Sequence, residues 1–433
     1  MIIARLFTLM SIAMVALPAD AATYELTAEQ RLGKQLYRDR DLSLNRNQAC
    51  ASCHRLRRTR DTDGERQATP GFVDARNTRD GSAVSPGSVP GHFGHLNSPS
   101  SAYAAFSPIF HWDPEEELYV GGQFWNGRAH DLAEQATLPF VNPDEMAMPS
   151  HWAVVTRLKE KSRYASEFSE VYDIDLDAIP AKEGALPGDP PPSGVEDAYD
   201  RMTRAIAAFE RIRRLNRFTS KFDFYLAGQT ELTETEAKGL EVFESETKGN
   251  CAACHPSTMT MGEGTAMIPP LFTDFTYDNI GLPRNVNIPG NPLPDPGLGG
   301  RGDIAAEDPD GLERGKHKVM GLRNIAVTAP YGHNGVFATL EQIVHFYNTR
   351  DTLGPVPDNN DPGFAVSGWP APEIAENVNV DELGDLGLTA EEEAQLVAFL
   401  RTLTDNYPKW GGDPLVPPGT PSPFADSALP PFP

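Results

Sequence analysis

The four cysteines of this chain stand in two identical patterns, and no other feature of its 433 residues constrains the fold as strongly. Both patterns read C-x-x-C-H, and their members are Cys50, Cys53, His54, Cys251, Cys254 and His255. This pattern is the attachment signature of c-type haem: the two thiols add to vinyl groups at one porphyrin edge, and the adjacent histidine binds the iron. We therefore expect two covalently bound haems, with His54 and His255 as iron ligands.

Three other interpretations of the cysteines compete with haem attachment. Two disulfides would suit an exported protein, but they would leave both following histidines unexplained. A thioredoxin-like redox site needs a β-α-β context that the sequence lacks. A single zinc site of four thiolates would have to bring together two pairs about 200 residues apart. Haem attachment explains all six residues at once.

The N-terminus predicts export. Arg5 precedes a mostly apolar stretch over residues 6–17, and Ala19-Asp20-Ala21 fits the small-x-small rule for signal cleavage. A membrane anchor is the alternative, but the apolar run is shorter than the roughly 20 residues that span a bilayer. No later segment is long enough either, so we expect no membrane span in the mature chain. The expected location is the periplasm, after cleavage near Ala21.

The charge balance excludes one class of partner. Lysine and arginine number 37 against 61 aspartate and glutamate residues, which gives a formal net charge of −24. Binding along a nucleic-acid backbone needs a basic surface, so we expect no nucleic-acid partner. Docking on anionic membranes is disfavoured for the same reason. A basic protein partner is compatible with this charge.

The surroundings of the two motifs are similar. Thr27 with Gln30, and Thr233 with Glu236, have the spacing of a helix capping box. Apolar residues then recur at helical spacing in each case, and a haem motif follows within about 20 residues. The repeat predicts that the opening of a small helical cytochrome c domain occurs twice.

Each repeat needs a closing helix, and two later amphipathic segments provide one. Residues 196–215 and 389–402 carry apolar stripes at helical spacing. We predict a mainly α fold of two cytochrome c-like domains, each carrying one covalent haem, with long irregular loops. The expected parts are a signal peptide (1–21), an N-terminal domain (22–218), a C-terminal domain (219–405) and a proline-rich extended tail (406–433).

With these residues in place, nearly all of the mature chain resembles the bacterial dihaem cytochrome c peroxidase/MauG family. Beyond the haem motifs, the resemblance rests on two blocks of sequence. The blocks are Phe124–Ala129 with Glu134–Ala136 and Asn142–Met146, and Leu322–Gly335 with Thr339–Glu341. The resemblance implies that the N-terminal haem reacts with hydrogen peroxide and that the C-terminal haem stores or relays electrons.

The resemblance also implies roles for single residues in the peroxide site. Trp125 matches a tryptophan that lies between the two haems. Gln135 and Glu145, ten residues apart, match a pair over the peroxide-binding iron. Pro139 matches a proline that packs on that face. Splitting the peroxide O–O bond requires a proton to move between its oxygens, and Glu145 can move it as general acid and base.

A calcium ion between the haem domains is a further implication. Asn97 matches its side-chain ligand, and Thr328 and Pro330 match its backbone carbonyl ligands. Ligation by oxygen alone suits Ca²⁺. His333 lies near the haem pair in the family, so we assign it a hydrogen-bonding role at the catalytic site.

The sixth ligand of the second haem separates two branches of the family. Conventional dihaem peroxidases have methionine fourteen residues after the histidine that matches His333, whereas this chain has Tyr347, as MauG does. A phenolate stabilises oxidised iron, and a thioether stabilises Fe(II). Met320 is the rival ligand. Weaker rivals are Met259, Met261 and Met267.

Two further differences from the conventional peroxidases bear on which branch of the family the chain resembles. The stretch from Tyr103 to Gln123 is longer than usual and resembles MbnH, a MauG relative that modifies a tryptophan of a small copper-binding protein. Conventional members carry a distal histidine that must leave the peroxide-binding iron before activation. His92 and His95 lie in the corresponding loop, but MauG-type enzymes lack that ligand. We favour a permanently open site.

These features predict a dihaem peroxidase-like oxidoreductase of MauG/MbnH type. It would use H₂O₂ to store two oxidising equivalents on the haem pair and oxidise a tryptophan of a partner protein. One alternative is a conventional cytochrome c peroxidase that takes electrons from a small cytochrome c or a copper-binding protein. Another is a dihaem electron carrier without enzymatic activity. Either a monomer or a homodimer fits the sequence.

Overall fold

The structure of the chain is a computed structural model that describes residues 25–56, 59–60, 66–67, 71–261, 267–425 and 429. The predicted signal peptide lies outside the described residues. Within the described part, no helix is long and apolar enough to cross a membrane.

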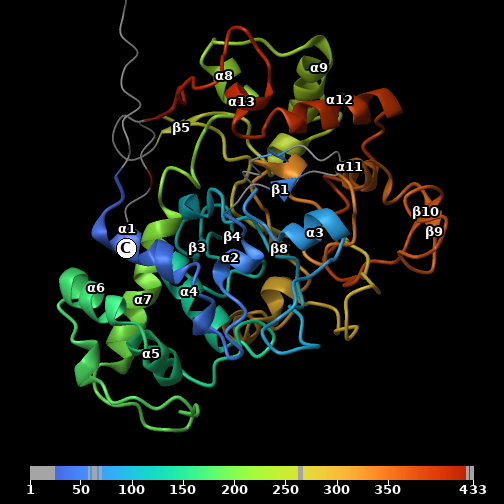
Figure 1. Cartoon of the computed structure of the whole chain (residues 1–433). Coiled ribbons are helices and arrows are strands. Elements are labelled where there is room, and N and C mark those ends of the chain that lie inside the picture. The colour runs from blue at the N-terminus through green and yellow to red at the C-terminus, as the bar shows by residue number, and fades with distance from the viewer. Residues whose placement is uncertain are drawn as a thin grey trace, which may run out of the picture.

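Helices dominate the described residues, and the strands are short (Figure 1). The α-helices are α1 (Ala28–Leu36), α2 (Cys50–Cys53), α3 (Ala75–Asp80), α4 (Leu132–Val141), α5 (His151–Lys159), α6 (Ser162–Tyr172), α7 (Val195–Glu210), α8 (Lys221–Leu226), α9 (Glu234–Glu244), α10 (Gly302–Glu307), α11 (Leu340–Thr349), α12 (Ala390–Arg401) and α13 (Tyr407–Trp410). Short 3₁₀ turns are η1 (Arg40–Leu42), η2 (Ala104–Phe106), η3 (Leu176–Ala178), η4 (Cys251–Ala253), η5 (Gly297–Gly300) and η6 (Ile325–Val327). The predicted mainly α fold is confirmed.

The strands form five separate two-stranded ladders. They are β1 (Thr59–Arg60), β2 (Arg66–Gln67), β3 (His111–Asp113), β4 (Leu118–Val120), β5 (Thr260–Met261), β6 (Met267–Ile268), β7 (Tyr277–Asp278), β8 (His317–Lys318), β9 (Gly354–Pro355) and β10 (Gly368–Trp369). Consecutive strands pair antiparallel except for β9 and β10, which pair parallel. No ladder here is wide enough to form a layer, so the haem motifs are held by helices and loops.

Both predicted capping boxes are present at the helices that open the repeat. Thr27 caps α1 with Gln30, and Thr233 caps α9 with Glu236. Each helix then packs against a closing helix, α1 on α7 and α9 on α12. The contact points are Gly33 and Gly239, where an added β-carbon would lie 1.7 Å and 2.0 Å from a carbonyl oxygen of the closing helix. Glycine is required at both crossings because the backbones touch.

The closing helices lie where the sequence predicts them, with one difference. The second, α12, matches the predicted range to within one residue at each end, and a capping box from Thr389 to Glu392 starts it. The first, α7, ends at Glu210 rather than at residue 215. The side-chain amide of Asn216 donates to the carbonyls of Glu210 and Ile212, at 3.1 and 3.0 Å. These bonds satisfy carbonyls that would otherwise need a longer helix.

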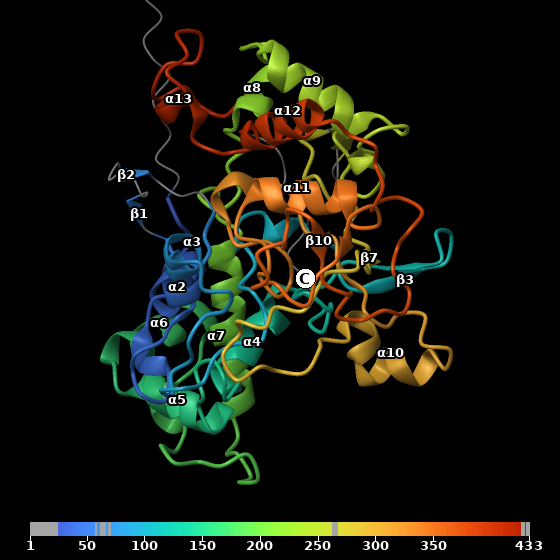
Figure 2. The same cartoon turned by 90° about the vertical axis from the view of Figure 1, so that its right-hand side faces the viewer.

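The apolar core divides between two large clusters. One draws its buried residues from 32–215 and the other from 222–403. We refer to these ranges as the N-terminal and C-terminal halves. In both views α8, α9, α12 and α13 gather at one end of the molecule, and α5, α6 and α7 lie toward the other (Figures 1 and 2). The division lies close to the predicted boundary at 218/219, which stays a prediction.

The tail after residue 405 is not wholly extended, contrary to the sequence-based expectation. Its first residues form α13, whose Tyr407 packs with Phe224 and Val416 in a small apolar cluster. Farther along, the hydroxyl of Ser422 donates to the carbonyl of Phe218 at 2.6 Å. The prolines break regular structure, but apolar residues between them still bury surface against both halves of the molecule.

Candidate active site

The second C-x-x-C-H motif opens into a cavity of about 330 Å³. Predicted site residues that line it are Trp125, Cys251, Cys254, His255, Met320 and Tyr347. The same cavity is lined by Asn97, Thr328, Pro330 and His333. The structure thus brings together ten side chains and carbonyls that the sequence spreads over 251 positions.

His255 is prepared as a metal ligand. Its Nδ1 lies 2.7 Å from the carbonyl oxygen of Phe272, to which it donates when the ring is neutral. Burial lowers the pKa of His255 to about 4, so the ring is neutral at ordinary pH. With the proton fixed on Nδ1, the lone pair of Nε2 is left for a metal. This arrangement fits the iron of a haem attached to Cys251 and Cys254.

None of the four cysteines forms a disulfide. Burial raises the pKa of the Cys53, Cys251 and Cys254 thiols to about 12. The two pairs pack on different apolar clusters, Cys50 with the N-terminal half and Cys251 with the C-terminal half. The alternatives of a disulfide pair and of one zinc site made of four thiolates therefore lack support in the structure.

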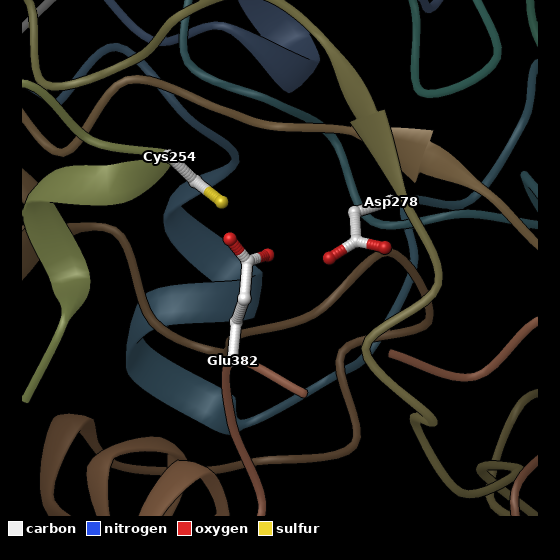
Figure 3. A group of neighbouring side chains, drawn as sticks. All are labelled: Cys254, Asp278 and Glu382. Atoms are coloured by element: carbon white, nitrogen blue, oxygen red, sulfur yellow. The ribbon is translucent and has the colours of Figure 1, made fainter. Parts of the chain in front are cut away.

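Two carboxylates face the sulfur of Cys254. Figure 3 shows Asp278 and Glu382 pointing into the same space as this thiol, and their ligand atoms lie within 4.8 Å of one another. Asn379 joins the two acids by donating to both, at 2.7 Å each. Three such groups can hold a metal ion, but a thioether bond to haem would occupy the sulfur. We interpret the two acids as part of the wall of the second haem pocket.

Both candidate sixth ligands reach the second cavity. Burial, and then the nearby Cys254 and Cys251 thiols, raise the pKa of Tyr347 above its ordinary value, which places the hydroxyl beside the haem-attachment residues. Met320 lines the same cavity. The three weaker rivals lie on or beside the β5–β6 ladder with exposed side chains: Met259, Met261 and Met267. The choice of ligand therefore lies between Tyr347 and Met320.

The first motif forms α2 and the turn after it. Burial lowers the pKa of His54, so its ring is neutral. Backbone hydrogen bonds at Phe72 and Pro99 oppose this shift only in part. A neutral ring has one nitrogen with a free lone pair, which is what an iron ligand requires. The residues of the first motif therefore also fit an attached haem.

Glu145 lies beside the first motif, as the resemblance implies. Its carboxylate adds to the effect of burial in raising the pKa of the Cys50 and Cys53 thiols. Burial raises the pKa of Glu145 itself, and Arg128 and a 2.9 Å hydrogen bond from Asn142 partly oppose this shift. The result is a carboxyl group that can take up and release a proton near the expected iron.

The other two residues of the predicted peroxide site lie on α4. Gln135 and Pro139 are four residues apart, so they lie on one face of this helix. Arg128, by contrast, was given no role by the sequence. Its guanidinium stacks 3.5 Å from the ring centre of Phe124 and supplies the positive charge nearest Glu145. The sequence feature that could have pointed to Arg128 is its position in the Phe124–Ala129 block, on which the family resemblance rests.

Asn97 connects the residues expected between the haems. Its carbonyl accepts from the indole of Trp125 at 2.8 Å, and its amide N–H donates to the carbonyl of His333 at 2.7 Å. Its side-chain amide donates to the carbonyl of Pro330 at 2.6 Å, and its side-chain oxygen accepts from Asn77 at 3.2 Å. Two of the three predicted calcium ligands therefore touch through a hydrogen bond, and the third, Thr328, lies two residues from Pro330. Ligation of Ca²⁺ by Asn97 would need its side-chain oxygen, rather than its nitrogen, to face the Pro330 carbonyl.

The stacking of His317 on His333 was not predicted from the sequence. His333 lies 6.3 Å from Trp125, between ring centres, and stacks on His317 at 3.6 Å. Burial lowers the pKa of His333 to about 4. His317 is buried and contacts Asp295 at 3.1 Å. A single histidine in a polar loop gave no signal for this stacking.

Comparison with known proteins gives consistent matches. The family described as di-haem cytochrome c peroxidase matches residues 27–231. The methylamine utilization protein MauG of Paracoccus denitrificans is 39% identical over 396 residues, which are 90% of each chain.

Solved structures agree with the sequence matches. The dihaem peroxidase BthA from Burkholderia thailandensis superimposes with a TM-score of 0.70 at 29% identity, over 95% of this chain and 92% of that one. A MauG-like protein associated with microbial copper homeostasis superimposes with a TM-score of 0.59 at 26% identity, over 88% and 91% of the two chains.

Proposed function

Because the chain belongs to the dihaem cytochrome c peroxidase/MauG family, we propose that it is a MauG-type enzyme that uses H₂O₂ to oxidise a tryptophan of a partner protein. At the coarser level it is a peroxidase-type oxidoreductase, and its family implies two covalently bound c-type haems. The haems, when bound, supply the peroxide chemistry and hold the oxidising equivalents. The residues of the chain position and protonate the reactants.

In this proposal Glu145 moves the proton at the peroxide site. Its buried carboxyl accepts a proton from one peroxide oxygen and returns it to the other through its Oε atoms. Gln135 orients the peroxide with its amide. Pro139 and the buried residues around α4 keep water out. Support comes from the nearness of Glu145 to Cys50 and Cys53.

The observation that carries the MauG-type assignment is the place of Tyr347. Its hydroxyl lies beside the second haem-attachment residues, at the position where conventional peroxidases have methionine. As a phenolate ligand, Tyr347 would stabilise the oxidised form of a haem iron bound at this site. Trp125, held by Asn97 and packed on His333, then couples the two sites.

The peroxide site is open in this proposal. His92 and His95, the candidates for a distal ligand, both contact Asp144, at 3.0 and 3.4 Å. Their side chains are 46% and 64% exposed, so binding the first haem would require them to leave these contacts. The proposal also includes calcium at Asn97, Thr328 and Pro330, and residence in the periplasm after signal cleavage.

Stopped-flow mixing with H₂O₂ tests the function. The fully ferric MauG-type enzyme should react at once and give a long-lived state two equivalents above ferric. A conventional cytochrome c peroxidase would need prior one-electron reduction, and an electron carrier would show no fast spectral change. Either of the last two results would reject the proposal.

A second experiment tests Tyr347 as the ligand. The low-spin ferric spectrum should lack the near-infrared band of thioether ligation, and Tyr347→Phe should change the low-spin signal while Met320→Ala leaves it intact. A thioether band that disappears in Met320→Ala but persists in Tyr347→Phe would transfer the ligand role to Met320.

A further inference from the structure

The β3–β4 hairpin presents an aromatic surface to solvent. Its register places Trp112 directly opposite Tyr119, and their rings meet edge to face with 4.8 Å between centres. Trp112 is 45% exposed, and Ile109, just before the hairpin, is 52% exposed. Figure 2 shows the hairpin standing out from the body of the molecule beside α10. Exposed tryptophan of this kind is typical of the anchor of a protein interface.

Carboxylates surround these rings. Residues 113–117 at the turn of the hairpin carry four acids, Asp113, Glu115, Glu116 and Glu117, and one proline, Pro114. From the side of α10, the charges of Glu307, Glu313 and Asp303 add to burial in raising the pKa of Tyr119. Two cations on this side are already paired, Arg301 with Asp303 at 2.5 Å and Lys316 with Glu313 at 3.1 Å, so they do not offset Glu307 or the acids of the turn. The rim is therefore negative, and a partner that fits it must be positive.

The surface is joined to the candidate active site by packed aromatic rings. Tyr119 stacks on Phe110 at 5.4 Å between centres, and Phe110 meets Tyr277 edge to face at 6.0 Å. The hydroxyl of Tyr277 fills the space beside Gly127, two residues from Trp125. Through β7 and β8, Tyr277 also pairs with Lys318, whose N–H donates to the Trp125 carbonyl at 2.7 Å.

We infer that the hairpin surface, formed by Ile109, Trp112, Tyr119 and the acidic turn 113–117, is the docking site for a small soluble protein with a lysine- or arginine-rich face. Trp112 enters the apolar centre of that interface, and the carboxylates form its rim. The net charge of −24 favours the encounter with a basic partner over long distances. The inference rests on the proposed function for its assumption that the enzyme acts with a partner protein.

Binding is tested with the ferric holoenzyme, without peroxide, and with mitochondrial cytochrome c as a small basic probe. Isothermal titration at low salt should show binding that weakens as NaCl is added, because exposed charge pairs are screened. The triple variant Glu115→Gln/Glu116→Gln/Glu117→Gln should raise Kd about tenfold, and Trp112→Ala should raise it several-fold.

A matched control removes the same charge elsewhere. Glu231→Gln/Glu241→Gln/Glu246→Gln changes exposed acids on and around α9, away from the hairpin in both views (Figures 1 and 2), and should change Kd less than twofold. The inference is overturned if the wild-type protein shows no salt-sensitive binding, or if the control triple weakens binding as much as the hairpin triple. It is also overturned if Trp112→Ala abolishes self-association while leaving cytochrome binding unchanged, since the hairpin would then serve a second copy of the chain.

The reaction of each variant with peroxide is measured separately. All three hairpin and control variants should react at the wild-type rate, which also shows that they fold and carry haem. Failure of the wild-type protein to react with peroxide would reject the proposed function and leave the binding result standing. Loss of hairpin-dependent binding with a normal peroxide reaction would reject the docking site alone.

Discussion

The two halves of the molecule share a helical frame, but Glu210 in one half and Asp223 in the other have different surroundings for a buried acid. In each half a capped helix crosses a closing helix at a glycine, Gly33 on α7 and Gly239 on α12. The N-terminal half leaves Glu210 buried without an ion pair among the described residues, and burial raises its pKa to about 8. The C-terminal half pairs buried Asp223 with Arg323 at 2.9 Å.

The comparison shows that the repeated helix crossing determines where the haem motifs lie but not whether a buried acid has an ion-pair partner. The helix crossing fixes where each C-x-x-C-H motif lies, and it is the same in both halves. An unpaired buried carboxyl such as Glu145 or Glu210 can become neutral and exchange a proton. A buried carboxyl with an ion-pair partner, such as Asp223 with Arg323, becomes costly to the fold when that partner is removed. Glu145 and Glu210, both in the N-terminal half, are therefore suited to exchanging a proton.

The largest expected effect follows from removing the proton carrier of that half. Glu145→Gln keeps the shape of the side chain but cannot accept a proton, so the reaction of the ferric protein with H₂O₂ should slow by about 10²–10⁴-fold. Stopped-flow absorbance measures the rate. Glu170→Gln, at an exposed position on α6, is the control and should react normally. A normal rate in Glu145→Gln would move the acid–base role elsewhere.

The second prediction breaks the ion pair of the C-terminal half. Arg323→Met removes the bidentate partner of Asp223, with its contacts of 3.1 and 2.9 Å, and leaves a buried charge uncompensated. The free energy of unfolding in urea should fall by about 3–5 kcal/mol. Adding Asp223→Asn should recover part of this loss. An additive loss in the double variant would mean that the pair is not coupled.

The third prediction concerns pH and returns to Glu210. Its pKa is about 8 in the folded chain against an ordinary value of 4.5, so between these values the folded state holds a proton that the unfolded state has lost. The stabilisation is complete below the ordinary pKa, and it disappears as pH rises through the folded pKa. The slope contributed by this one group is at most about 1.4 kcal/mol per pH unit.

Urea unfolding at pH 5, 6, 7 and 8 provides the measurement for Glu210. Glu210→Gln should flatten the fall in stability over this range, because the amide does not titrate. Thr27→Ala serves as the comparison, since it lowers stability in the same half without adding or removing a titrating group. An unchanged slope in Glu210→Gln would show that its carboxyl is ionised in the folded protein.

The sequence predicted the shared frame better than the differences between the halves. Capping boxes and amphipathic stripes are local patterns, so α1, α9 and α12 lie where they were expected. The Asp223–Arg323 pair joins residues 100 positions apart, and no local pattern signals it. The stacking of His317 on His333 and the seating of Arg128 beside Glu145 depend on tertiary contacts in the same way.

Some site residues could be predicted from local sequence patterns, whereas the positions of others depend on tertiary contacts. The haem motifs are local patterns, and burial lowers the pKa of both of their histidines. Tyr347 could be found only from its spacing after His333, and its competition with Met320 persists because both line one cavity. The end of α7 and the helix α13 were missed because side-chain capping by Asn216 and packing on Phe224 override local propensity.

The smallest expected effect tests whether the two halves, which share a helical frame, unfold independently. Thr27→Ala and Thr233→Ala each remove one capping box, where the hydroxyl accepts from an amide at 3.1 and 3.3 Å. Each should cost about 1 kcal/mol of unfolding free energy. If the halves unfold separately, each variant shifts only its own transition, which haem absorbance and differential scanning calorimetry can follow. If both variants shift one common transition by the same amount, the boundary near residue 218 does not separate independent folding units.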